Sequence, residues 1–166
     1  MVSFKSNAKN YRDAESMAAA YLAAYFANSK IKYPLNPFKM LKDEGVEFKI
    51  CNFNKLEGVY IPAQSQEDIS IVGISAKRPI TRQRFTAAHE LCHHFRDADK
   101  QVACPIGKKN ASEYFADAFA SALLMPMGEL KIKVNEYKDI NGNVSFDDIL
   151  KIADYFGVSF EACVRR

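Results

Sequence analysis

The sequence lacks the features that mark membrane-spanning, secreted and strongly nucleic-acid-binding proteins. No segment approaches the run of about 20 apolar residues that a transmembrane helix requires. The first ten residues are polar, so no secretion signal is expected in them. Lys and Arg number 23 against 20 Asp and Glu, and the net charge of +3 is too small to indicate a nucleic-acid or membrane surface.

Closely spaced cysteine pairs are also missing. The chain has no C-x-x-C motif, and its four cysteines are far apart: Cys51, Cys92, Cys104 and Cys163. Without a secretion signal, reduced thiols in the cytoplasm are expected rather than disulfides. Low-complexity tracts and internal repeats are absent too, and 48% of the 166 residues are hydrophobic, which favours one compact domain with at most a small appendage.

The apolar spacing predicts an α+β fold. Helical periodicity and capping residues predict helices at 13–28, 36–45, 79–97, 110–125, 128–138, 145–156 and 160–166. Alternating or β-branched runs predict strands at 46–50, 58–61 and 69–74. Because these strands are close in sequence, we expect a small antiparallel three-stranded sheet, with 69–74 as a candidate edge for an extended substrate. Residues 97–109 are expected to be irregular.

All three histidines lie in the stretch 85–95, which contains the motif His89-Glu90-Leu91-Cys92-His93. Two histidines four apart on a helix lie about 40° apart, so both rings can reach one ion. Glu90 projects about 100° from His89, where a carboxylate can hold a water bound to that ion. This arrangement is typical of zinc hydrolases. The alternative is a pair of histidines satisfied by carbonyl groups, with Glu90 on a solvated face.

A third ligand is expected from another element, because catalytic zinc usually has three protein ligands. In the helix after Asn110, Glu113 and Asp117 share the apolar face. Glu113 can bind the metal, and Asp117 can hydrogen-bond to the far nitrogen of a zinc-bound histidine. Two alternatives stay open at this point. Glu113 is also the N3 residue of a capping box that begins at Asn110, and Asp117 can be an ordinary surface acid.

Two blocks of sequence resemble the ImmA/IrrE family of zincin-like metallopeptidases. The first is R-x-R-F-T-x-A-H-E-x-x-H from Arg82 to His93, and the second is E-x-x-A-D-x-F-A-x-x-L-L-M-P from Glu113 to Pro126. The resemblance covers about Gly58 to Pro126, and both flanks are compatible with it. It implies a Zn²⁺ ion on His89, His93 and Glu113, with Glu90 as the general base. It also implies a metallopeptidase domain over 1–138 and a partial helix-turn-helix-like segment over 139–166, packed on that domain.

Three residues near the motif have less certain roles. Cys92 stands where the family usually has Gly, and it is either a small core side chain or a thiol near the metal that could affect activity. Tyr114 and His94 are weak candidates for a donor that stabilises the oxyanion. His94 is expected to point away from the side of the helix that carries His89 and His93.

The resemblance further implies a cytoplasmic endopeptidase whose substrate is a helix-turn-helix repressor of a mobile element or stress regulon. The 139–166 segment carries few basic residues before Arg165-Arg166, so packing or partner docking is expected rather than direct DNA binding. Two other functions stay open. One is a non-proteolytic regulator that keeps the zincin fold and binds a repressor or DNA. The other is a noncatalytic interaction domain with structural histidines.

Overall fold

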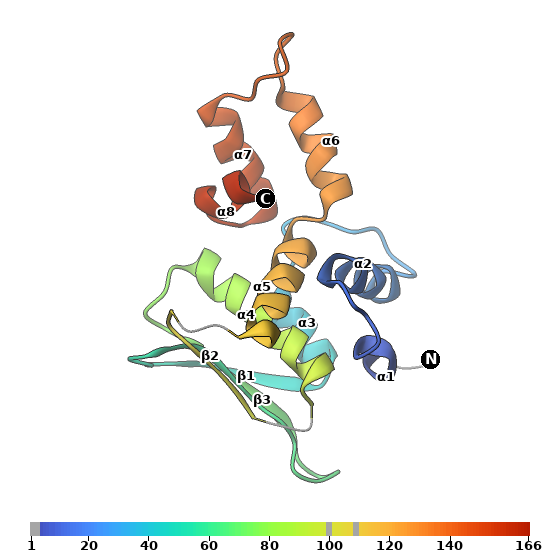
Figure 1. The fold of residues 1–166 in the computed structure, drawn as a ribbon, viewed down its shortest axis with the longest axis vertical. Helices are drawn as coiled ribbons and strands as arrows, with labels where there is room; N and C mark the ends of the chain where they lie inside the picture. Colours follow the sequence, from blue (N-terminus) through green and yellow to red (C-terminus); the bar gives the residue numbers. More distant parts are fainter. Residues whose placement is uncertain (1–3, 99–100, 108–109) are drawn as a thin grey trace.

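The computed structural model describes residues 4–98, 101–107 and 110–166, and these form a mixed α+β fold (Figure 1). The elements in chain order are α1 (Phe4–Ala8), α2 (Ala14–Tyr25), α3 (Pro37–Asp43), β1 (Val46–Cys51), β2 (Leu56–Ile61), β3 (Ser70–Ser75), α4 (Ile80–Arg96), β4 (Val102–Pro105), α5 (Ala111–Leu124), α6 (Met127–Tyr137), α7 (Phe146–Phe156) and α8 (Phe160–Arg165). The predicted α+β class is therefore confirmed.

Several helices begin where a short polar side chain caps the first turn. The Asp13 carboxylate accepts the Ser16 N–H at 2.7 Å, and the Asn36 side chain accepts the Lys39 N–H at 3.1 Å. Such caps satisfy backbone donors that have no partner inside the helix. At the other end, Gly157 closes α7 with a φ of 65°, a left-handed conformation that glycine adopts without steric cost. These local signals explain why the seven predicted helices agree closely with α2 to α8, whereas the short helix α1 was not predicted.

The sheet differs from the predicted antiparallel three-stranded meander. It has four strands in the order β1-β3-β2-β4, and β1 pairs parallel to β3. The two antiparallel pairs both involve β2, which pairs with β3 on one side and with β4 on the other. The reason is burial: β3 is buried along nearly its whole length, so it takes the central position between β1 and β2. The prediction assumed that strands close in sequence pair with each other. The strand order instead follows from which strand is most buried.

Two further predictions about the sheet are wrong. The run 69–74 is not an edge on which a substrate could add, because β3 has a paired strand on each side. The segment 97–109 is not wholly irregular, because it contains the strand β4. Among the described strands, the two edges of the sheet are β1 and β4. No apolar alternation marks the short β4, which is defined by its backbone pairing with β2.

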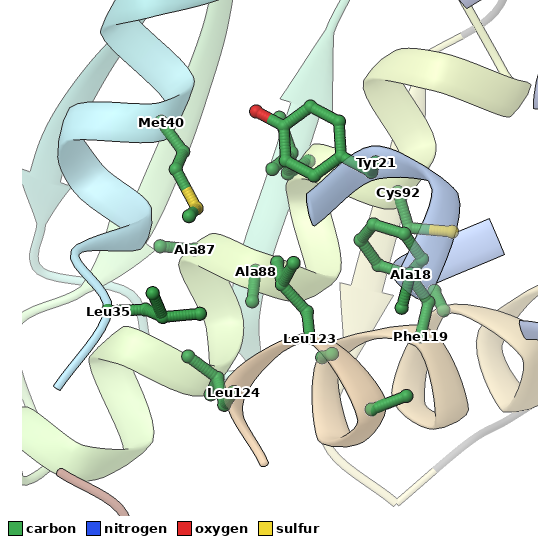
Figure 2. Close-up of a cluster of buried hydrophobic side chains, with 14 of the residues drawn as sticks. Ala18, Tyr21, Leu35, Met40, Ala87, Ala88, Cys92, Phe119, Leu123 and Leu124 are labelled. Carbon is green, nitrogen blue, oxygen red and sulfur yellow. The ribbon is translucent and has the colours of Figure 1, made fainter. Parts of the chain in front are cut away.

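Helix α4 crosses the sheet and is covered on its other side by α5, on which α2 packs (Figure 1). Figure 2 shows the cluster of buried side chains that joins these helices. Ala88 and Leu123 are fully buried in it, and they bring the backbones of α4 and α5 close together. Burial of large apolar side chains contributes about 1.5–3 kcal/mol each. The core therefore holds α4 rigidly between two layers.

The helices α6, α7 and α8 extend away from the sheet (Figure 1). Arg84 of α4 donates to the Gly157 carbonyl at 2.9 Å and also to the Leu35 carbonyl. Arg166 donates to the Met125 carbonyl at 3.2 Å, so one of the two terminal arginines is engaged in packing. In the part of the chain that the structure describes, no helix combines the length and apolarity needed to cross a membrane.

Candidate metal centre

The two histidines of α4 point their ring nitrogens at each other. His89 Nε2 and His93 Nε2 are 3.1 Å apart, and both side chains are buried. They come together because residues four apart lie on one helix face. Packing on both sides of α4 excludes water from the rings. The two histidine rings therefore converge, as the helical spacing predicted.

Glu113 reaches the same point from the first turn of α5. Its Oε1 lies 3.3 Å from His93 Nε2, and its Oε2 lies 3.4 Å from His89 Nε2. The Glu113 backbone N–H donates to Asn110 Oδ1 at 3.0 Å, so Asn110 caps the helix while the Glu113 carboxylate faces the histidines. Burial would raise the pKa of Glu113, but hydrogen bonds to His89 and His93 hold it well below its ordinary value. The cap and the donor role thus occur together.

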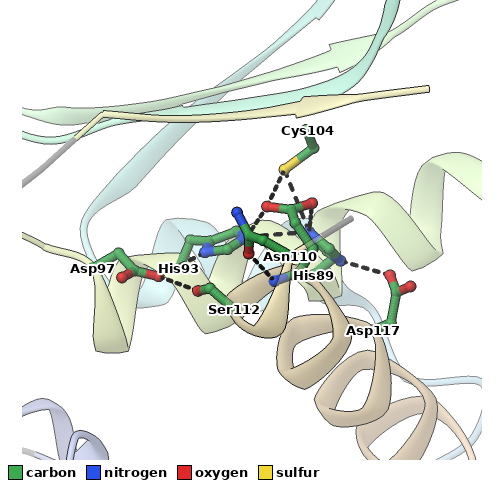
Figure 3. A network of polar contacts seen from close by, with 8 residues as sticks. His89, His93, Asp97, Cys104, Asn110, Ser112 and Asp117 are labelled. Atoms are coloured by element: carbon green, nitrogen blue, oxygen red, sulfur yellow. Dashed lines mark hydrogen bonds and ion pairs between the residues drawn. The ribbon is translucent and has the colours of Figure 1, made fainter. Parts of the chain in front are cut away.

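Carboxylates hold the far nitrogens of both histidines (Figure 3). His89 Nδ1 lies 2.9 Å from Asp117 Oδ1, and His93 Nδ1 lies 2.8 Å from Asp97 Oδ2. Such contacts place the proton on Nδ1 and aim the Nε2 lone pair at a metal. Burial alone would lower the pKa of each histidine. The contacts with Asp117 and Glu113 raise that of His89, and those with Asp97 and Glu113 raise that of His93 to about 9.

Glu90 is completely buried, and neither of its carboxylate oxygens has a hydrogen-bond partner among the described residues. The alternative in which Glu90 lies on a solvated face is therefore wrong, because β2 covers this side chain. A Cβ atom on Gly58 of β2 would fall 2.1 Å from Glu90 Oε1, so only glycine fits there. Burial raises the pKa of Glu90 to about 7, against the charges of His89 and His93. An unpaired buried carboxylate is costly and indicates a missing partner.

Cys104 of β4 completes a group of four possible metal ligands. Its Sγ lies 3.3 Å from His89 Nε2 and 3.7 Å from Glu113 Oε1. Donor atoms of His89, His93, Cys104 and Glu113 all lie within 4.8 Å of one another, and all four residues are buried. Burial and the nearby carboxylates of Glu90 and Glu113 raise the pKa of the Cys104 thiol.

The residues present fit a zinc ion. Two neutral imidazoles, a carboxylate and a thiol are the donor types that zinc takes. Their convergence, together with the orphaned carboxylate of Glu90, matches a centre built for a metal and a water. Buried His89, His93, Cys104 and Glu113 could therefore form a metal site.

Comparison with known families decides which group of proteins this is. The profile of the IrrE N-terminal-like domain, in peptidase family M78, matches residues 41–166. The chain belongs to this family. The matched range is wider than the predicted resemblance, and it includes residues 139–166, whose division from the rest as a separate segment stays a prediction.

Comparisons with single proteins add the fold and little more. The search of curated proteins finds no match. A solved structure described as a Mycobacterium tuberculosis transcriptional regulator is 14% identical, with a TM-score of 0.57 over 96% of this chain and 50% of that chain. This IrrE N-terminal-like chain thus spans half the length of that protein, and a likeness at this identity shows the fold alone.

The three less certain residues lie away from the donors. Cys92 is buried in the apolar cluster with Ala18 and Phe119 (Figure 2). His94 is also buried, and its Nδ1 lies 3.2 Å from the Tyr60 hydroxyl. Tyr114 is 64% exposed. The structure therefore favours a packing role in the core for Cys92. It places neither His94 nor Tyr114 among the candidate metal ligands.

Sequence reasoning missed Asp97 and Cys104. Asp97 lies four residues after His93 at the end of α4, so the helical spacing could have identified it as a partner of the His93 ring. Its carboxylate also accepts a hydrogen bond from the Ser112 hydroxyl at 3.1 Å. Cys104 had no such local signal, because its position depends on the pairing of β4 with β2.

A cleft of about 430 Å³ begins beside the donors and runs toward α8. It shares Arg82, Phe85 and Asp117 with the much smaller space of about 50 Å³ at the donors themselves. Apolar side chains of α5 and charged side chains of α8 line its far part, among them Leu124 and Arg165. The cleft is large enough for several side chains, whereas the space at the donors holds about one or two waters.

Proposed function

We propose that the chain is a zinc-dependent endopeptidase that cleaves a helix-turn-helix transcriptional repressor of a mobile element or stress regulon, in the cytoplasm. The observation that carries the hydrolytic part is the buried, unpaired carboxylate of Glu90 beside two histidines whose Nε2 atoms converge. Membership of a peptidase family supports the same reaction. The repressor as substrate rests on the family resemblance.

In the proposed mechanism, His89, His93 and Glu113 hold the ion, and Asp97 and Asp117 keep both imidazoles in the tautomer that offers Nε2. A bound zinc ion would lower the pKa of a water toward about 7 and polarise the scissile carbonyl. Glu90 would accept a proton from the attacking water and return it to the leaving amine. The raised pKa of Glu90, about 7, suits a group that must both accept and return a proton near neutral pH.

The substrate is proposed to occupy the cleft between α4, α5 and α8. The cleft adjoins the small space at the donors through Phe85 and Asp117, so a chain lying in it brings a peptide bond near His89 and Glu113. Arg82 and Arg165 line its wall, and each already pairs with a carboxylate, Glu57 and Glu161 respectively, so the lining does not select for the charge of the substrate. Helix α8 lies in the segment that resembles a helix-turn-helix. Because this segment carries few basic residues, we propose that it docks a partner rather than reads DNA.

The test measures metal content and cleavage together. Purified protein is expected to hold one zinc per chain and to cut the helix-turn-helix repressor encoded beside its gene. Glu90→Gln keeps the metal and the shape of the side chain, and should reduce cleavage by about 10²–10⁴-fold. The matched control is Tyr114→Phe, which removes an exposed hydroxyl of α5 and should leave cleavage unchanged.

Each other outcome has a defined meaning. Absence of stoichiometric zinc would overturn the proposal and favour structural histidines in an interaction domain. Undiminished cleavage by Glu90→Gln would remove Glu90 from its role as base. Zinc binding and repressor binding with no cleavage under any condition would favour a non-proteolytic regulator with a zincin fold.

A further inference from the structure

The strand β4 places a thiol where a hydrolytic metal centre keeps an open position. In β4, Cys104 is opposite Gly58 of β2, and Ala103 is opposite Val59. Cys104 is 5% exposed, whereas Ala103 is exposed, so β4 turns the thiol inward. Figure 3 shows the sulfur of Cys104 above the two histidines. The side chain is therefore held in place by the backbone pairing of an edge strand.

The donor atoms of the four residues lie within 4.8 Å of one another, and several of their separations are close to those of ligand atoms around one ion. Zinc–nitrogen, zinc–oxygen and zinc–sulfur bonds of about 2.0–2.3 Å place neighbouring ligand atoms roughly 3.3–3.6 Å apart. The observed separations are 3.1 Å between the histidine nitrogens and 3.3 Å and 3.4 Å from those nitrogens to Glu113. From Cys104 Sγ they are 3.3 Å to His89 Nε2 and 3.7 Å to Glu113 Oε1.

Four protein ligands are the mark of a closed zinc site, whereas catalytic sites hold three and leave the fourth position to water or substrate. The space of about 50 Å³ at the donors is too small for a peptide, although the adjoining cleft of about 430 Å³ is not. Glu90 is fully buried beside the Cys104 thiol, which takes the place of the water that this base would serve. The small space, the four donors and the position of Glu90 all agree with a closed metal site.

We propose that Cys104 is a fourth protein ligand to the metal and keeps the site latent until its thiolate leaves. This inference rests on the proposed zinc site of His89, His93 and Glu113. Closure exchanges ligands without redox change: the thiol loses its proton to solvent, the thiolate binds the metal, and one bound water leaves. Opening is the reverse exchange, in which a water takes the position and the sulfur regains a proton. An electrophile such as iodoacetamide makes opening permanent, because a carbon–sulfur bond forms and iodide departs.

The first experiment uses the full chain loaded with Co²⁺ in place of zinc. Thiolate coordination gives Co²⁺ an intense near-ultraviolet charge-transfer band, which nitrogen and oxygen ligands do not give. The wild type and Cys92→Ala should both show the band, and Cys104→Ala should bind cobalt and lose it. Cys92→Ala is the matched control, because it removes a buried thiol of α4 that is not among the four donors.

The second experiment needs no substitution and so does not depend on a variant folding. The wild-type protein is treated with iodoacetamide with and without zinc, and the modified cysteines are located by mass spectrometry. Zinc should slow the modification of Cys104. The rate at which the half-buried Cys51 is modified should not change. Equal rates at Cys104 would overturn the inference.

The outcomes separate this inference from the proposed function. Cobalt bound without a thiolate band, or the same band in Cys104→Ala, would show that Cys104 is not a ligand and would leave the peptidase proposal intact. No cobalt bound by any form would overturn both. Cleavage of the repressor should rise in Cys104→Ala above the wild type, and wild-type cleavage that Cys104→Ala does not exceed would contradict latency.

Discussion

Helix α4 is buried on two sides, and the two sides differ in what fills them. One side contributes Ala88, Cys92 and Phe95 to the apolar core. The other carries Glu90, His89 and His93 under the sheet, with partners supplied by β4 and α5. The first side is satisfied by burial alone, since apolar contacts have no direction. The second side buries polar groups that need partners, and the Glu90 carboxylate still has no hydrogen-bond partner there, which makes it a site rather than a core.

The largest effect is expected when a donor is removed. Glu113→Gln keeps the side-chain volume and the cap at Asn110, but replaces the carboxylate by a weaker ligand. Loss of an outer partner of a metal ligand costs about 10–100-fold in affinity, so loss of this ligand should cost more than about 100-fold. The measurement is zinc affinity by competition with a chelator dye.

The matched variant is Asn110→Ala, which removes the cap and spares the carboxylate. It should destabilise the protein by about 1 kcal/mol and leave zinc affinity within a few-fold. If Glu113→Gln bound zinc as tightly as the wild type, the Glu113 carboxylate would not be a zinc ligand.

Next in size is the loss of the carboxylates behind the histidines. Asp97→Asn and Asp117→Asn remove the negative charge from the contacts with His93 Nδ1 and His89 Nδ1. Each should weaken zinc binding by about 10–100-fold. Titration calorimetry with zinc measures this, and unchanged affinity in Asp117→Asn would return Asp117 to the role of a surface acid.

The sequence predicted the two sides of α4 unequally. Helical spacing was enough to bring His89 and His93 together, but it left the role of Cys92 open. Glu113 and Asp117 could be placed because helix α5 has its own amphipathic pattern and cap. Cys104 and the burial of Glu90 could not be predicted, because both depend on β2 and β4, whose pairing is set by long-range contacts. Local periodicity contains no information on which strand lies above a helix.

An intermediate effect is expected at the point where β2 meets the donor side. Gly58→Ala would bring a methyl group against Glu90 Oε1 and within 2.6 Å of Thr86 Cγ2. Overpacking of this kind costs about 1–3 kcal/mol. Thermal unfolding should show the loss, and cleavage should fall because Glu90 must move. Gly128→Ala is the control, since a Cβ there meets no atom within 4 Å. Equal melting temperatures for the two variants would show that β2 yields without cost.

A smaller effect is expected on the core side. Cys92→Ala removes one buried sulfur from the cluster with Phe119 and Ala18, and should destabilise the protein by about 1–2 kcal/mol. Zinc affinity should not change, because the thiol is not among the donors. Chemical denaturation and metal titration on one sample test both statements. A change in zinc affinity without loss of stability would place Cys92 in communication with the metal.

The smallest effect is the pH dependence of the metal-free protein, and it arises on the donor side alone. The pKa of His93 is raised to about 9 and that of Glu90 to about 7. A group with a raised folded pKa stabilises the fold below its unfolded pKa, and this contribution is lost as pH rises through the folded value. In the presence of chelator, the melting temperature should therefore fall between pH 6 and pH 9, by a few degrees if the change is about 1 kcal/mol. With zinc bound, the gain in stability over the metal-free protein should grow with pH, because metal binding releases protons from the ligands. A melting temperature that does not change from pH 6 to pH 9 without metal would contradict this prediction. It would show that the charge states of His93 and Glu90 do not affect the stability of the metal-free fold.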